Sequence, residues 1–156
     1  MIVAFIGHRH TPETEDLYAR LKEVVQALIE NEGADTFLFG SKRTFNSMSY
    51  EVVSELKETF PNLRRVYMRT VYESAGAYTL QYLLDGYEET VFPKGVAGAG
   101  SLSYIKRNQA MIDACDLLVA YCAPSDPYKT RKSGTMLAVQ YAQKKKKRTI
   151  NLFTAE

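Results

Sequence analysis

The strongest constraint on the fold is a regular alternation of short apolar runs with longer segments of helical periodicity. Residues 2–6 form a continuous apolar run, which is typical of a strand covered on both faces. Residues 14–31 then carry leucine, valine and isoleucine side chains three and four positions apart, which predicts an amphipathic helix. Thr11 or Thr14 can cap the start of this helix, and Gly33 can close its end.

The alternation continues to the end of the chain. Further strands are expected over residues 36–39, 65–71, 90–92, 117–121 and 149–153. Further helices are expected around the apolar stripe of residues 48–56 and over residues 77–84, 101–114 and 134–144. Because parallel neighbours need crossover connections, this order favours a mostly parallel sheet flanked by helices. The sequence therefore predicts an α/β fold, and its length of 156 residues predicts one domain over residues 1–156.

The composition argues against several classes of protein. Hydrophobic residues make up 46% of the chain and charged residues 24%, as in ordinary globular domains. The net charge of +2 is too small to indicate nucleic-acid binding. Cys115 and Cys122 form no Cys-x-x-Cys pair and no histidine cluster accompanies them, so neither a metal site nor a disulfide is expected. No apolar run approaches the ~20 residues of a membrane span and no basic leader is evident, so we expect a cytoplasmic protein without membrane contact.

The loops that follow the strands are expected to meet at one edge of the sheet, where open α/β sheets bind ligands. The segments concerned are residues 7–10, 40–43, 69–70 and 121–135. Gly7 would let a ligand approach the backbone, His8 can titrate near neutrality, and Arg9 offers a planar set of donors for phosphate or carboxylate. The alternative is that Gly7 only makes a tight turn and Arg9 pairs with a surface carboxylate.

Two further motifs are candidates for ligand binding. Ser133, Gly134 and Thr135 form a small-residue turn that opens a helix, where free N–H groups and the helix dipole favour a phosphate. The alternative is ordinary helix capping by serine or threonine. Arg107 could reach an anion and Asn108 could contact a base or ribose hydroxyl, or both could lie on a solvated helix face. Neither a P-loop nor a Gly-x-Gly-x-x-Gly turn occurs in the chain.

Three other features have both a functional and a structural interpretation. Glu51, on the second helix near Gly40 and Ser41, could act as a general base or hold a ribose hydroxyl, or it could be a solvated carboxylate near a helix start. The basic run 144–148 could attract nucleic-acid phosphates, or it could be a solvated helix end. Of the 11 tyrosines, one or two could stack on a base.

Six motifs follow one another with a spacing that resembles a known group of proteins. They are Gly7-His8-Arg9, Phe39-Gly40-Ser41, Glu51-Val52-Val53 with Glu55-Leu56-Lys57, Arg107-Asn108 with Met111 and Asp113, Ser133-Gly134-Thr135, and Tyr141-Ala142 with Ile150-Asn151-Leu152. The chain resembles the YpsA-like branch of the SLOG superfamily, which also holds the DNA-processing protein DprA and the Lonely Guy phosphoribohydrolases. The resemblance covers nearly the whole chain. It implies a Rossmann-like three-layer sandwich that binds nucleotides or nucleotide-derived ligands, often as a homo-oligomer.

The chain also departs from these relatives at two positions. The Lonely Guy signature Gly-Gly-x-Gly-Thr-x-x-Glu ends in a catalytic glutamate, whereas this chain has Ala138 there, which argues against hydrolysis by that route. Relatives tend to have Phe-Asp where this chain has Phe45 and Asn46, and the missing carboxylate argues against acid–base chemistry at the second loop.

The first functional hypothesis is therefore a module, such as a sensor, that binds a nucleotide-derived small molecule. Phosphate would be held by Arg9, Ser133, Gly134 and Thr135, and ribose or base by Gly40, Ser41, Asn108 and Glu51. The alternative is an N-glycoside hydrolase acting on nucleoside monophosphates, with Glu51 orienting the ribose or activating water. A second alternative is single-strand nucleic-acid binding through Arg43, Arg107 and the basic run. The sequence does not identify a cofactor and leaves open whether the protein is an enzyme.

Overall fold

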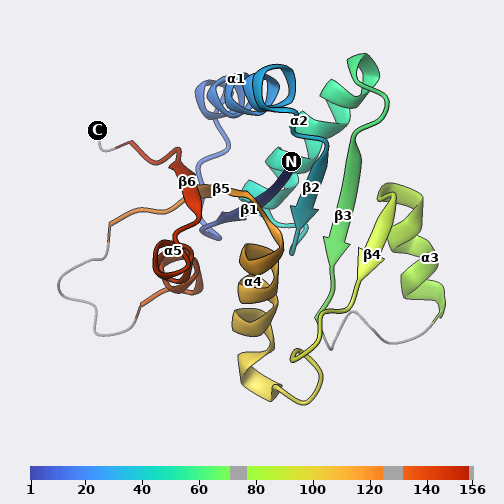
Figure 1. Ribbon diagram of the computed structural model, residues 1–156, viewed down its shortest axis with the longest axis vertical. Coiled ribbons are helices and arrows are strands. Elements are labelled where there is room, and N and C mark those ends of the chain that lie inside the picture. Colours follow the sequence, from blue (N-terminus) through green and yellow to red (C-terminus); the bar gives the residue numbers. More distant parts are fainter. Residues whose placement is uncertain (71–76, 125–131, 155–156) are drawn as a thin grey trace.

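The strands of the chain form one sheet, which confirms the predicted α/β class. The computed structural model describes residues 1–70, 77–124 and 132–154, and within these ranges six strands pair in parallel in the order β4-β3-β2-β1-β5-β6 (Figure 1). The strands are β1 (Ile2–Gly7), β2 (Thr36–Phe39), β3 (Arg64–Met68), β4 (Glu89–Val91), β5 (Leu117–Tyr121) and β6 (Arg148–Asn151). The helices are α1 (Glu15–Glu32), α2 (Thr44–Thr59), α3 (Ala77–Gly86), α4 (Ser103–Ala114) and α5 (Gly134–Lys144), and a 3-10 turn, η2 (Gly100–Leu102), precedes α4.

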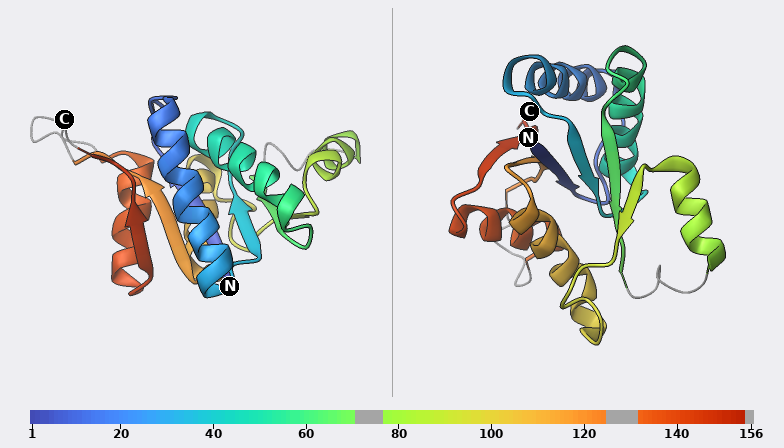
Figure 2. Two further views of the ribbon diagram at one scale, coloured as in Figure 1. Left: turned by 90° about the horizontal axis from the view of Figure 1, so that it is seen from above. Right: turned by 45° about the vertical axis from the view of Figure 1, so that its right-hand side comes forward.

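Helices cover both faces of the sheet, which makes the molecule a three-layer sandwich (Figure 2). On one face, α1 and α2 pack against alternate strand residues such as Phe5 and Phe39. On the other face, α4 and α5 pack against the intervening residues, such as Ala4 and Leu38. The central strands are therefore buried on both sides, which explains why they appear in the sequence as continuous apolar runs.

The ends of the helices follow the predicted capping residues. Thr14 caps α1, since its hydroxyl oxygen accepts a hydrogen bond from Leu17 N at 3.1 Å. Gly33 ends the same helix in the left-handed conformation, at φ 73°.

Two strand ends differ from their predictions by more than one residue. The strand expected over residues 65–71 ends at Met68, which pairs with Val91, the last residue of the short β4. The strand expected over residues 149–153 ends at Asn151, whose partner Ala120 is the last residue of β5 that pairs with β6.

The strand order creates a switch point between β1 and β5. The chain leaves β1 toward β2 on one side, and β5 pairs with β1 on the other side. Because all the strands are parallel, their carboxyl ends lie at one edge of the sheet, and ligands of open α/β sheets bind outside this edge. The helices return antiparallel to the strands, so the N-termini of α2, α4 and α5 also lie at this edge (Figure 1).

The basic run 144–148 leads into β6, the last strand of the sheet. Lys147 Nζ donates to the carbonyl oxygens of Asp113 and Cys115, at 3.4 and 2.9 Å. Arg148 pairs with Glu32 of α1. Lys147 and Arg148 thus have structural contacts, whereas the lysines at 144–146 are exposed.

Three expectations from the composition concern the cysteines, a metal site and a membrane span. Cys115 and Cys122 are free and buried, and burial raises the pKa of the Cys115 thiol to about 11. Among the described residues, no group of three His, Cys, Asp or Glu side chains is placed to hold a metal ion. None of the helices in these ranges has both the length and the apolar character needed to cross a membrane.

Candidate functional site

His8 joins the loops at the switch point. Its backbone N–H donates to Tyr121 O at 3.1 Å, and its Nε2 accepts a hydrogen bond from Ala123 N at 2.8 Å. The hydroxyl groups of Thr11 and Thr44 donate to the His8 carbonyl oxygen. Since Nε2 is an acceptor, the imidazole is neutral and carries its proton on Nδ1. His8 thereby connects the segments that follow β1, β2 and β5.

Gly7 is required by packing at the end of β1. A Cβ atom placed on Gly7 would lie 2.5 Å from both Cβ and Cγ of Phe45, which is fully buried in the first turn of α2. The group that approaches Gly7 closely is therefore the Phe45 side chain of the protein itself. Arg9 is exposed next to it, and in the described part of the chain it forms no ion pair.

Arg107 lies against the backbone at the carboxyl end of β2. Its side chain comes from α4 and is only 8% exposed, so it does not lie on a solvated helix face. A Cβ atom on Gly40 would lie 2.7 Å from Arg107 Nε and 2.8 Å from Met111 Sδ. Arg107 Nη2 donates to Asn108 Oδ1 at 3.1 Å, and its Cζ lies 5.3 Å from the centre of the Tyr104 ring. The structure therefore places Arg107 against Gly40, two residues that the sequence named as separate ligand-binding candidates.

Two buried donors near this edge lack hydrogen-bond partners among the described residues. Ser103 lies one helical turn before Arg107 on the same face of α4 and is 1% exposed, yet its Oγ has no partner there. Arg69 follows β3 directly, and its Nε is also buried without a partner in that part of the chain. Its guanidinium carbon lies 5.6 Å from the centre of the Phe92 ring. Native proteins leave few buried polar groups unsatisfied, because each costs about 1–3 kcal/mol.

The start of α5 packs beside α4. Ser133 caps α5, since its Oγ accepts a hydrogen bond from Met136 N at 3.0 Å, which confirms the capping alternative for this hydroxyl oxygen. Thr135 is buried. Gly134 and Asn108 line the same shallow hollow, whose volume of about 10 Å³ leaves no room for a ligand. The structure thus brings these two predicted residues together, although residues 125–131 of the preceding segment lie outside the described ranges.

Ser41 and Glu51 interact with nearby residues of the protein. Ser41 is half-buried, and its Oγ accepts a hydrogen bond from Arg43 N at 3.0 Å. Glu51 is exposed on α2, close enough to Tyr18 of α1 to affect it. The pKa of Tyr18 rises to about 12, first because of burial, then because of Glu55, with a smaller contribution from the charge of Glu51. These surroundings favour the solvated-carboxylate interpretation of Glu51.

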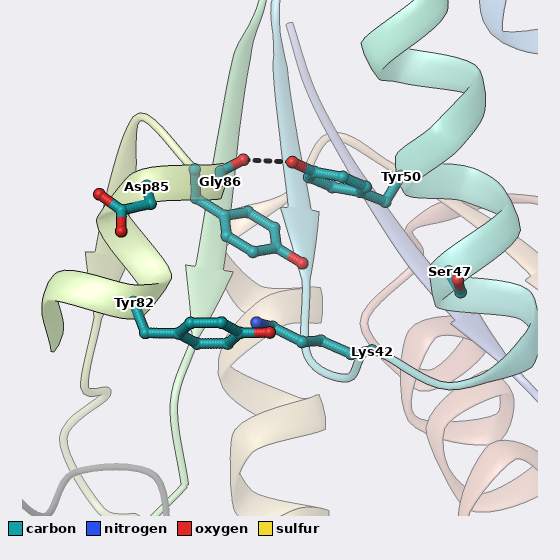
Figure 3. Close-up of a pocket in the computed structure, with 7 residues that line it drawn as sticks. Lys42, Ser47, Tyr50, Tyr82, Asp85 and Gly86 are labelled. Atoms are coloured by element: carbon teal, nitrogen blue, oxygen red, sulfur yellow. Dashed lines mark hydrogen bonds between the residues drawn. The ribbon is translucent and has the colours of Figure 1, made fainter. Parts of the chain in front are cut away.

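A pocket that the sequence did not predict lies between α2 and α3 (Figure 3). Its volume of about 380 Å³ is in the range of small-molecule sites. It is lined by Lys42, Ser47, Tyr50, Tyr82, Asp85, Gly86 and Tyr87. Lys42 Nζ lies 3.8 Å from the centre of the Tyr82 ring and about 6 Å from the centres of the Tyr87 and Tyr67 rings. These residues come from distant parts of the sequence. The only sequence signal that pointed to them was the number of tyrosines, 11 in the chain.

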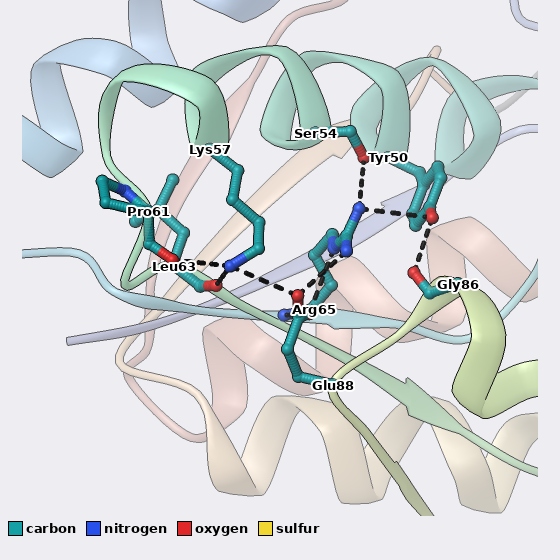
Figure 4. A network of polar contacts seen from close by, with 8 residues as sticks. All are labelled: Tyr50, Ser54, Lys57, Pro61, Leu63, Arg65, Gly86 and Glu88. Atoms are coloured by element: carbon teal, nitrogen blue, oxygen red, sulfur yellow. Dashed lines mark hydrogen bonds and ion pairs between the residues drawn. The ribbon is translucent and has the colours of Figure 1, made fainter.

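A polar network holds one wall of this pocket in place (Figure 4). The Tyr50 hydroxyl donates to the Gly86 carbonyl oxygen at 2.5 Å and accepts a hydrogen bond from Arg65 at 3.3 Å. Arg65 also pairs with Glu88 at 2.9 Å, and Lys57 lies 3.3 Å from the same carboxylate. Partial burial by itself raises the pKa of Glu88, but the hydrogen bonds and charge of Arg65 lower it to about 2. The Tyr50 side of the pocket is therefore fixed to β3 and to the end of α3.

Comparison with known proteins does not assign a function to these residues. The chain matches no protein-family model and no curated protein. The arrangement of residues at the carboxyl edge and in the tyrosine pocket is therefore the basis for a functional proposal.

Proposed function

We propose that the protein binds an anionic, nucleotide-derived ligand at the carboxyl ends of β2 and β3, with a phosphate group held by Arg69, Ser103 and Arg107. The observation that carries the proposal is the pair of buried donors, Arg69 Nε and Ser103 Oγ, that lack partners in the described residues. A phosphate presents several acceptor oxygens and a negative charge, and a guanidinium group binds it through parallel hydrogen bonds.

The electrostatics of this edge support an anion. Arg69 forms no ion pair within the described ranges. Ser103 and Arg107 lie in the first two turns of α4, where the helix dipole favours negative charge. Because Gly40 has no side chain, the guanidinium of Arg107 can lie directly against the end of β2.

The nucleotide part of the proposal comes from the resemblance to the SLOG superfamily. The assignment of the phosphate to Arg9 and to residues 133–135 remains a prediction from the sequence. The buried donors support a position nearer to β2 and β3, since the hydroxyl oxygen of Ser133 already caps α5. Glu51 is exposed and offers no support for hydrolysis, so the proposal is limited to binding.

Ribose 5-phosphate and a panel of nucleoside monophosphates test the proposal by isothermal titration calorimetry. Arg69→Met should weaken binding at least tenfold, because hydrogen bonds to charged groups contribute about 1.5–3 kcal/mol each. Arg64→Met is the matched control, since Arg64 lies at the other end of β3 and pairs with Glu89. Ser103→Ala should also weaken binding but leave the stability of the ligand-free protein unchanged or slightly raised, because it removes an unsatisfied hydroxyl.

Two results would contradict the proposal. One is the absence of any binding of phosphorylated ligands at millimolar concentration. The other is equal affinity of the wild type, Arg69→Met and Arg64→Met.

A further inference from the structure

The pocket between α2 and α3 has the chemistry of a site for a flat heteroaromatic ring. Tyr50, Tyr82 and Tyr87 contribute aromatic surface, and Tyr82 is 60% exposed. The ammonium of Lys42 is a donor, and the carboxylate of Asp85 is an acceptor. A ligand that uses all of these groups is planar and carries both acceptors and amino donors on its edge, as a nucleobase does.

We propose that this pocket binds the base of the nucleotide-derived ligand, with the base stacked on Tyr82. This inference rests on the proposed function in that it assigns the second half of the same ligand. The volume of about 380 Å³ is present while Lys42 lies on the Tyr82 ring, so a ring can enter without rearrangement of the fold.

Lys42 changes partner when the base binds. Its ammonium contacts the ring of Tyr82, a cation–π contact that is weak at an exposed ring. An acceptor atom on the base offers Lys42 a hydrogen bond instead, and the face of Tyr82 then becomes available for stacking. The amino groups of the base can donate to Oδ2 of Asp85, one helical turn after Tyr82, since Oδ1 already accepts a hydrogen bond from Gln81 Nε2 at 3.0 Å.

The loop between β2 and α2 connects this pocket to the proposed phosphate position. Gly40 contacts Arg107 on the α4 side of the sheet, whereas Lys42, two residues later, reaches into the tyrosine pocket on the α2 side. The wall formed by Tyr50 is held by Arg65 and by the carbonyl of Gly86, so this side of the pocket is formed before a ligand arrives.

The test compares three ligand types on the wild type and three variants by isothermal titration calorimetry. The ligands are the four common nucleoside monophosphates, the corresponding nucleosides, and ribose 5-phosphate. Tyr82→Leu should weaken the best nucleotide and its nucleoside about tenfold, the scale of base stacking on an aromatic side chain. It should leave ribose 5-phosphate unchanged. Tyr82→Phe should bind the base as the wild type does, because it keeps the aromatic ring. Leu84→Ala is the control, because Leu84 is an exposed residue of α3 that does not line the pocket.

The outcomes separate the inference from the proposed function. If ribose 5-phosphate binding depends on Arg69 but Tyr82→Leu leaves nucleotide and nucleoside affinities unchanged, the base site is wrong and the phosphate site stands. If nucleosides bind in a Tyr82-dependent way while ribose 5-phosphate does not bind, the phosphate site is wrong and the base site stands. If no member of the three ligand types binds, both are wrong.

Discussion

Substitution of Gly40 by alanine tests the contact between β2 and α4 most directly. The new Cβ would lie 2.7 Å from Arg107 Nε and 2.8 Å from Met111 Sδ. Favourable contacts between heavy atoms lie near 3.5–4.0 Å, so both side chains must move by about 1 Å. Overpacking of this kind costs about 1–3 kcal/mol, which for a chain of this size lowers Tm by roughly 2–10 °C. Because Arg107 is displaced, the affinity for ribose 5-phosphate should fall as well.

Gly134→Ala is the matched control for this substitution. A Cβ atom on Gly134 meets no atom within 4 Å, and Gly134 is the first residue of α5. Alanine there should leave stability unchanged or raise it by up to about 1 kcal/mol. Thermal unfolding followed by circular dichroism measures the first effect, and calorimetric titration measures the second. Equal Tm and equal ligand affinity for Gly40→Ala and Gly134→Ala would refute the reasoning.

Two further predictions concern stability alone. Gly7→Ala should destabilise the fold by about 3 kcal/mol in urea unfolding, because its Cβ would lie 2.5 Å from both Cβ and Cγ of the buried Phe45. Gly134→Ala, whose Cβ meets no atom within 4 Å, is the control, and equal free energies of unfolding for the two variants would show that the clash has no effect. The folded-state pKa of Glu88, about 2, lies below its ordinary value of 4.5, so its pairing with Arg65 stabilises the fold above pH 4.5 and this contribution is lost as the pH falls toward 2. Allowing for solvent screening, Glu88→Gln should cost about 1 kcal/mol at pH 7 and progressively less below pH 4.5, and a constant difference over pH 3–7 would contradict this pKa.

The fold was largely predictable because hydrophobic periodicity is a local property of the chain. The apolar run 117–121 and the helical stripe 134–144 coincide with β5 and α5, and both are bounded by clear capping or turn residues. The end of β3 was not predictable, because it depends on where the short β4 stops pairing with it.

The part of the candidate site that could be predicted consists of residues that directly follow a strand. Gly40 was expected at the carboxyl edge because it follows a predicted strand, but its contact with Arg107 of α4 was not predicted. The tyrosine pocket could not be predicted either, since Lys42 and Tyr82 are 40 positions apart and no local pattern links them. The missing partner of Ser103 is likewise a property of the packed structure and has no signal in the sequence.

The basic run before β6 has a consequence for how the molecule avoids aggregation. β6 is a terminal strand, and such a strand can pair with a strand of another chain through its outer backbone groups. Here the exposed lysines at 144–146 and the partly neutralised Arg148 bring positive charge to the start of that strand. The like charges therefore disfavour a parallel pairing of two β6 strands, in which the starts of both strands would lie side by side.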